Sequence, residues 1–173
     1  MIGMLLMICL AVAPLVATQR PNATNWKPLE FFVGSWDGQE TGTEGTGTGR
    51  RTYEFELGGR YLVGKNRSVF PPQDRKPKGE VHEDWEIFSY DEGRKLYVLR
   101  QFHIEGFVVQ LRQDIASSTA DRLVFVSESV ENGPPGLQVR ATYEIKGPDE
   151  FVEIFEVSEG FNVKLTNIWK RSR

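Results

Sequence analysis

Short segments in which hydrophobic and polar residues alternate, separated by turn-forming residues, fill most of the chain after position 28. The alternation is clearest between Gly79 and Gln113, where its period of two indicates β-strands rather than helices. Asp91-Glu92-Gly93-Arg94 and Glu105-Gly106 have the residue types of tight turns between antiparallel strands. We therefore predict three consecutive antiparallel strands over Val81–Tyr90, Lys95–Ile104 and Phe107–Asp114.

Both predicted turns contain an even number of residues, so the three strands keep their faces in step. Pairing Tyr90 with Lys95 and Ile104 with Phe107 collects most apolar residues on one face, which we predict to be the interior. That face carries Val81, Glu83, Trp85, Ile87, Val98, Arg100, Phe102, Ile104, Phe107, Val109 and Leu111. The opposite face, with His82, Asp84, Glu86, Gln101 and His103, has the polar composition of a solvent-facing surface.

Glu83 and Arg100 are the two charged residues on the predicted interior face, close enough in this register to form an ion pair beside Trp85 and Phe102. The pair either fixes strand register as a structural salt bridge or serves as polar handles for a ligand. A single β-bulge would invert the faces. In that case His82 and His103 would become the interior polar pair.

The remaining strands follow from the same signals. Gly58-Gly59 predicts a hairpin that places Tyr53 on an inner face opposite Gly64. Glu128 alternates with one set of valines but not with Leu123 and Phe125, so it faces either the interior or water. The strands predicted here are Arg50–Leu57, Arg60–Phe70, Asp121–Val130, Leu137–Lys146, Glu150–Val157 and Phe161–Lys170.

A short helical turn after Pro28 is expected to lay Leu29, Phe32 and Val33 across one barrel end, with Trp36 opening the first strand. The glycine-rich segment Thr41 to Gly49 lacks the Gly-Lys-Ser/Thr of a phosphate loop and is interpreted as a bulged strand edge. About ten meandering strands predict one all-β domain over residues 29–173. We expect an antiparallel up-and-down β-barrel with a short N-terminal helical plug, after a linker over residues 18–28.

The composition of the chain also indicates where the protein is located and which partners it binds. Ile2 to Ala17 is an uncharged apolar run that predicts a signal peptide over residues 1–17 and a secreted or periplasmic protein, with an uncleaved anchor as the alternative. The only cysteine, Cys9, lies in this run, so the mature chain would contain no thiol. A net charge of −3 without a basic stripe disfavours a nucleic-acid partner. Oligomeric state is not predicted.

The Gly34-Ser35-Trp36 segment after a short helical turn resembles the first strand of the calycin superfamily, which includes the lipocalins. The chain is more similar to nitrobindin-like β-barrels, and most similar to a neighbouring bacterial barrel family of unknown function. Segments that carry this resemblance are His82–Asp84, Phe88–Asp91, Leu99–Phe107 and Ser127–Pro134, within a match that spans Leu29 to Arg171. The calycin resemblance implies a basic residue near Trp169, from Lys170-Arg171, packed on Trp36.

The nitrobindin resemblance also implies haem, held by a histidine on the last strand. This chain has Lys164-Leu165-Thr166-Asn167 there and no histidine after His103, so haem is disfavoured and no cofactor is predicted. His82, Asp84 and His103 have metal-ligand side chains on one face, but that face is predicted to be external, so no metal site is predicted.

Three functions are consistent with the sequence. The first is a barrel that binds a small apolar or amphipathic molecule, with Glu83, Arg100, Trp85, Phe102, Tyr53 and Glu128 as ligand-binding residues. The second is a cavity enzyme in which Glu83 acts as general base and Arg100 stabilises an oxyanion. The third is a structural protein whose barrel is packed solid.

Overall fold

The computed structural model describes residues 25–42, 45–74, 76–157 and 163–173, which form one helical turn and ten strands. The predicted leader and most of the linker lie outside the described residues. The elements are α1 (Lys27–Glu30), β1 (Gly34–Gly42), β2 (Gly45–Glu56), β3 (Tyr61–Phe70), β4 (Glu80–Asp91), β5 (Leu96–His103), β6 (Val108–Gln113), β7 (Arg122–Glu131), β8 (Val139–Gly147), β9 (Glu150–Val157) and β10 (Val163–Arg171).

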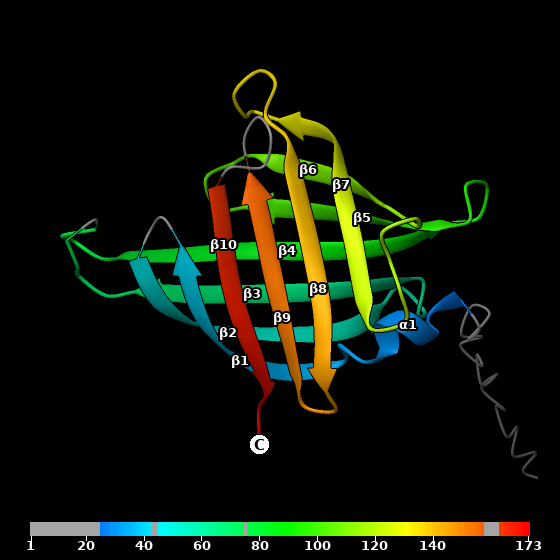
Figure 1. The fold of residues 1–173 in the computed structure, drawn as a ribbon, viewed down its shortest axis with the longest axis horizontal. Coiled ribbons are helices and arrows are strands. Elements are labelled where there is room, and N and C mark those ends of the chain that lie inside the picture. The colour runs from blue at the N-terminus through cyan, green and yellow to red at the C-terminus, as the bar shows by residue number, and fades with distance from the viewer. Residues whose placement is uncertain (1–24, 43–44, 75, 158–162) are drawn as a thin grey trace, which may run out of the picture.

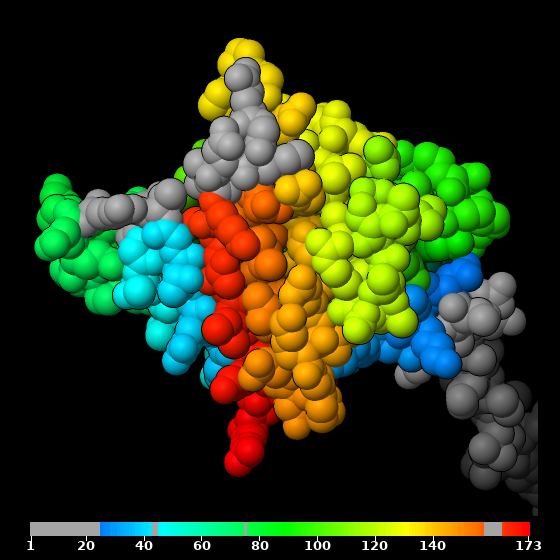
Figure 2. Space-filling view, viewed as in Figure 1, coloured from blue at the N-terminus to red at the C-terminus, as the bar shows by residue number. Residues whose placement is uncertain are grey.

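Each strand pairs antiparallel with its neighbours in the chain, and β1 pairs with β10 to close the barrel. Figure 1 shows β8, β9 and β10 crossing in front of β2, β3 and β4, as expected for the two walls of a twisted barrel. In the space-filling view, β8, β9 and β10 form a closely packed wall beside the cyan β1–β2 hairpin (Figure 2). The predicted fold class, an all-β closed barrel of about ten strands with a short helical turn, is confirmed.

The β2–β3 hairpin has the predicted register. Tyr53 pairs with Gly64, and a β-carbon added to Gly64 would lie 2.5 Å from Cε1 of Tyr53. Glycine is therefore required here because the tyrosine ring occupies the space that any side chain would need.

The predicted faces of β4 and β5 are wrong. The turn before β6 has three residues, Ile104 to Gly106, closed by the His103 backbone N–H donating to the Phe107 carbonyl at 3.1 Å. Gly106 adopts φ +91°, the left-handed position of a three-residue hairpin loop. An odd loop length reverses the parity between β5 and β6.

As a result, Val109 and Leu111 point inward as predicted, while β4 and β5 turn Phe88 and Leu99 inward in place of the predicted face. Both side chains then join the continuous hydrophobic core, and this burial explains why the face that carries Phe88 and Leu99 points inward. The β4–β5 turn is even, as predicted, but Tyr90 pairs with Tyr97 instead of Lys95, a shift of two residues that leaves the relative faces unchanged.

The helical turn α1 closes one end of the barrel. Leu29 and Phe32 are buried as expected, but Val33 is 38% exposed and lies outside the plug. Arg171 fixes the turn in place, because its Nη1 and Nη2 donate to the carbonyls of Val33 and Phe31, each at 2.9 Å. Its guanidinium carbon also lies 4.2 Å from the Trp36 ring centroid, which confirms the predicted cation on Trp36.

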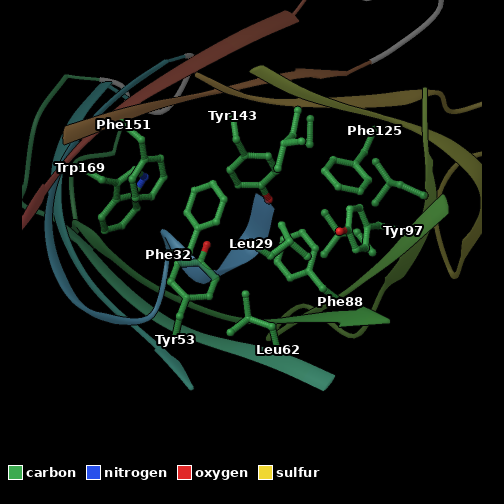
Figure 3. Packing of buried hydrophobic residues seen from close by; sticks show 14 of the residues in the cluster. Leu29, Phe32, Tyr53, Leu62, Phe88, Tyr97, Phe125, Tyr143, Phe151 and Trp169 are labelled. Carbon is green, nitrogen blue, oxygen red and sulfur yellow. The ribbon is translucent and has the colours of Figure 1, made fainter. Parts of the chain in front are cut away.

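Aromatic side chains fill the plug end of the barrel (Figure 3). Phe32 packs edge-to-face on Phe151 at a centroid distance of 5.0 Å, and Phe151 in turn packs on Trp36 at 4.8 Å. Edge-to-face pairs stabilise such a cluster beyond the burial of apolar area alone. Among the described residues, no helix has the length and apolar character needed to cross a bilayer.

The described residues of the glycine-rich segment form a regular ladder between β1 and β2, without the predicted bulge. Thr41 also pairs with β10, and Thr48 and Gly49 also pair with β3, whereas Gly42 and residues 45–47 pair on one side only, as a strand edge does. A β-carbon on Gly49 would lie 2.8 Å from the Trp169 ring, and one on Gly47 would lie 2.7 Å from the Phe70 ring. The glycines therefore make room for large inward side chains of neighbouring strands.

Candidate functional site

The inward side chains change character along each strand as it runs from the plug toward the open end. On β4 the inward positions are Phe88, Glu86, Asp84 and His82, in that order. On β3 they are Leu62, Gly64, Asn66 and Ser68. A layer of polar groups therefore lies directly above the aromatic core.

Arg51 on β2 is the centre of this polar layer. Its Nη1 lies 3.3 Å from Oε2 of Glu86 and 3.1 Å from Oε1 of Glu153, and all three side chains are almost fully buried. The Arg51 guanidinium carbon lies 4.3 Å from the Trp169 ring centroid, so the cation also rests on an aromatic face. One guanidinium is thus shared between two carboxyl groups from strands far apart in sequence.

Glu86 accepts hydrogen bonds at both carboxyl oxygens. Oε1 accepts from the Tyr143 hydroxyl at 2.6 Å and from Nε2 of Gln101 at 3.0 Å. Oε2 accepts from Arg51 and from the Tyr53 hydroxyl. Full satisfaction of a buried carboxyl group makes this network structurally specific.

The two carboxyl groups that share Arg51 differ in their pKa. Burial raises the pKa of Glu86 to about 7, against the opposing effect of Arg51. Burial also acts to raise the pKa of Glu153, but the charge and hydrogen bond of Arg51, with hydrogen bonds from Asn167 and Trp169, hold it below its usual value. Of the two carboxyl groups that share Arg51, Glu153 is therefore the one that ionises more readily.

A second group of polar side chains lies between this layer and the open end. Asn66 donates from Nδ2 to Oδ2 of Asp84 at 2.7 Å and to the Ser68 hydroxyl at 2.9 Å, while Ser68 donates to Oε1 of Glu40. Burial raises the pKa of Glu40, with the Ser68 hydrogen bond opposing it. With Glu40 and Asp84, the buried charged groups of the described residues comprise four carboxyl groups and one guanidinium.

Most of these residues line a cavity of about 500 Å³ that opens at the end away from α1. Its polar side includes Glu40, Arg51, Asn66, Asp84, Gln101, Glu153 and Asn167, and its apolar side includes Phe70, Phe107, Phe155, Val157 and Leu165. Oδ1 of Asn66 and Oε1 of Gln101 are buried acceptors with no hydrogen-bond donor among the described residues. Water or a ligand that donates hydrogen bonds would satisfy both atoms.

Two histidines lie at the cavity mouth. Nδ1 of His82 is 2.8 Å from Oε1 of Glu105, and Nε2 of His82 is 3.5 Å from Nδ1 of His103. The His103 ring stacks on Phe107 at a centroid distance of 4.1 Å. The two histidines therefore form the interior polar pair that the sequence predicted for the case in which the faces of β4 and β5 are inverted.

Five of the six predicted ligand-binding residues lie on the outer surface of the barrel, four of them on β4 and β5. Trp85 is 52% and Phe102 40% exposed, and the Glu83 side chain is 51% exposed beside Arg67. Arg100 is partly exposed and donates to the Ser89 hydroxyl at 3.3 Å. The predicted interior Glu83–Arg100 pair is therefore wrong, because the three-residue turn directs the opposite face of β4 and β5 inward.

Of the other two predicted residues, Tyr53 lies inside the barrel and Glu128 lies outside. Tyr53 is buried in the interior, but its hydroxyl donates to Glu86 beneath the cavity and the residue does not line it. Glu128 lies outside, where it pairs with Arg94 at 2.6 Å and accepts from Gln110. A register shift between Gln110 and Leu111, opposite Ser129 and Ser127, leaves Glu128 unpaired in the ladder and ends the inward alternation of Leu123 and Phe125.

Sequence reasoning missed most of the polar lining. Arg51, Glu40 and Asn167 are single polar residues at inward positions of otherwise alternating strands. The detectable signal was an interruption such as Glu153 between Phe151 and Phe155, where one polar residue shares the period of buried aromatics.

No protein-family model matches the chain, and no curated protein matches it. The fold is similar to the crystal structure of Rv2717c from M. tuberculosis, with a TM-score of 0.64, 17% identity and coverage of 87% of this chain and 99% of that chain. A redesigned β-barrel, mFAP0, bound to DFHBI, has a TM-score of 0.45 at 11% identity, covering 82% of this chain and 99% of its own. The first of these similarities shows that the chain shares the closed antiparallel barrel fold of Rv2717c.

Proposed function

We propose that the protein binds a small amphipathic molecule in the open half of the barrel, with a cationic or hydrogen-bond-donating head group in the polar layer. The observation that carries this proposal is the excess of buried acid over buried base around the cavity: the carboxyl groups of Glu40, Asp84 and Glu153 line it, Glu86 lies beneath it, and Arg51 is the one buried guanidinium of the described residues. Buried carboxylates without compensating charge are costly, so a positive head group is the complement that this layer favours.

The shape of the cavity supports an amphipathic ligand. A volume of about 500 Å³ lies within the range of small-molecule sites, and Phe70, Phe107 and Phe155 form an apolar side toward the mouth. An alkyl or aromatic body would pack on these rings while the head group reaches Glu40, Glu153 and the unsatisfied amide oxygens of Asn66 and Gln101.

The two other functions predicted from sequence are less well supported. A solid barrel is inconsistent with a cavity of this size. The cavity enzyme required Glu83 and Arg100 inside, and both lie on the outer surface.

Membership of the nitrobindin-like or calycin families stays a prediction. The haem that the nitrobindin resemblance implies finds no histidine on β10, where the residues that line the cavity are Leu165 and Asn167. Secretion or periplasmic localisation, expected from Ile2 to Ala17, also stays a prediction.

The proposal is tested with three probes of equal chain length: n-octylammonium, 1-octanol and octanoate, titrated into metal-free protein in EDTA and followed by calorimetry. We expect n-octylammonium to bind most tightly and octanoate most weakly. Affinity for the ammonium probe should rise with pH, because burial raises the pKa of Glu40 and the cation binds its ionised form.

Glu40→Gln keeps the oxygen that accepts from Ser68 but removes the charge, so n-octylammonium affinity should fall about tenfold or more. Glu83→Gln is the matched control, since the same change on the outer surface should leave the affinity unchanged. Preferential binding of octanoate, or equal effects of the two substitutions, would contradict the proposed function.

A further inference from the structure

We propose that the cavity mouth is a site for a divalent transition-metal ion such as Zn²⁺. In this site Nε2 of His82, Nδ1 of His103 and the Asp84 carboxylate are the ligands, and Glu105 holds the His82 ring in position. The side chains come from β4, β5 and the turn after β5. One ligand atom from each of His82, His103 and Glu105 already lies within 4.8 Å of the others.

The hydrogen bonding of His82 determines which nitrogen is available. Oε1 of Glu105 accepts from Nδ1 of His82 at 2.8 Å, because a carboxylate has no proton to donate. In a neutral ring this leaves the lone pair on Nε2, directed toward His103. Metal-binding histidines usually donate their other ring N–H to a carboxylate in this way, so Glu105 is the expected outer partner of a metal ligand.

The spacing of the two rings fits a shared ion better than it fits a hydrogen bond. Nε2 of His82 and Nδ1 of His103 are 3.5 Å apart, which is long for a hydrogen bond between nitrogens. Two nitrogens bound to tetrahedral Zn²⁺ at about 2.0–2.1 Å are separated by roughly 3.3–3.4 Å. An ion between the rings therefore requires only a small adjustment of either side chain.

Asp84 supplies an oxygen on the same side. It pairs with His103 in the β4–β5 ladder, and its Oδ2 lies 3.9 Å from Nε2 of His82. The Asp84 side chain is nearly buried and is held by the hydrogen bond from Asn66. A set of two imidazoles and one carboxylate leaves a fourth position open toward the cavity, as in zinc sites that bind water or substrate.

The surroundings of the two rings favour a cation. The His103 ring is held by stacking on Phe107, its Nδ1 faces Nε2 of His82, and no described residue hydrogen-bonds its own Nε2. The excess of acid over base deeper in the barrel adds attraction for a divalent ion.

The test uses untagged protein freed of metal with chelator, into which Zn²⁺ is titrated by calorimetry and Co²⁺ by visible absorption. His82 and His103 are the two histidines of the chain, so a nitrogen-ligand spectrum in Co²⁺ reports on this site directly. Cys9→Ser in the full chain removes the single thiol as a competing ligand. We expect one ion per chain, with visible bands typical of four-coordinate Co²⁺.

Three substitutions separate ligands from the outer partner. His82→Ala and His103→Ala should each weaken Zn²⁺ binding by more than about 100-fold, whereas Glu105→Gln should weaken it by about 10- to 100-fold, the range for an outer partner. Glu83→Gln is the control and should change nothing. Thermal unfolding of each metal-free variant identifies any that is not folded, and Asp84→Asn then provides a further variant that retains the side-chain shape.

Absence of stoichiometric binding, or Zn²⁺ affinity that survives both histidine substitutions, would overturn the proposed metal site. The outcome is independent of the proposed function, because n-octylammonium binding is measured in EDTA.

Discussion

The two halves of the barrel interior are built from the same strands, yet one is a solid aromatic core and the other is a polar cavity. Strand β4 contributes Phe88 to the first half and Asp84 to the second, and β9 contributes Phe151 to the first and Glu153 to the polar layer between them. The difference shows that the alternation which builds a barrel does not decide whether its interior is filled. That depends on which residue occupies each inward position.

The packed half supplies the stability that the polar half cannot. Around α1, Leu29, Phe32 and Trp36 are fully buried among aromatic neighbours. In the polar layer, by contrast, Arg51 and its carboxyl partners are desolvated, and a buried ion pair contributes little net stability. The packed half of the barrel therefore offsets the cost of desolvating the charged side chains in the polar half.

The largest expected difference between the two halves comes from making the same substitution, phenylalanine to alanine, in each of them. Phe32→Ala should lower the free energy of unfolding by about 3–5 kcal/mol, because it opens a void in the fully packed cluster. Phe155→Ala, at a partly buried position on the cavity side, should cost about 1 kcal/mol or less since the space around it is already open. Urea unfolding measures both, and equal losses would contradict the division into packed and open halves.

The next effect concerns the charges between the halves. Arg51→Met should destabilise the protein by roughly 3 kcal/mol at pH 8, because Glu86 and Glu153 lose their shared cation while remaining buried. Lowering the pH toward 5 should recover part of the loss as the two carboxyl groups take up protons. Arg100→Met, the same change on the outer surface, is the control and should fall within about 0.5 kcal/mol of the unaltered protein.

A smaller effect is expected in the pH dependence of stability. The pKa of Glu86 is raised to about 7, so its protonated form is favoured by folding and its contribution is fully present below the unfolded value near 4.5. That contribution is lost as pH rises toward 7, which lowers stability by at most about 3 kcal/mol between the two values. Glu153, whose pKa is lowered, acts in the opposite direction and loses its contribution as pH falls.

Glu86→Gln should flatten this decline, measured as the free energy of unfolding from pH 4.5 to pH 8. Glu83→Gln should keep the full slope, because that side chain is half exposed on the outer face. An unchanged slope in Glu86→Gln would show that another group titrates in this window.

The smallest expected effect concerns Gly64, which lies beside the Tyr53 ring at the boundary between the packed half and the polar half. Gly64→Ala should cost about 1–2 kcal/mol, since the new β-carbon would meet the Tyr53 ring at 2.5 Å and disturb its hydrogen bond to Glu86. Gly147→Ala is the matched control, because no atom lies within 4 Å of a β-carbon there, and it should change stability by less than about 0.5 kcal/mol. Thermal unfolding compares the two, and equal shifts would argue against a close fit at Tyr53.

The sequence by itself determined the strands, their number and the closed barrel, because period-two alternation and turn residues are local signals. It also determined the Tyr53–Gly64 register, since two glycines in a tight turn allow few alternatives. The helical turn around Pro28 could be predicted from a short segment in the same way, whereas the cation on Trp36 was implied only by the resemblance to calycins.

Only the tertiary structure decided which face of β4 and β5 points inward. The choice depends on whether Ile104 belongs to a strand or to the turn. Lengthening the turn by this one residue directs Asp84, Gln101 and the two histidines into the barrel in place of Glu83 and Arg100. Burial of Phe88 and Leu99 in the shared core settles that choice, and the partners of each are far away in sequence. The polar layer was beyond local signals for the same reason, because Arg51, Glu86 and Glu153 meet only when the sheet closes.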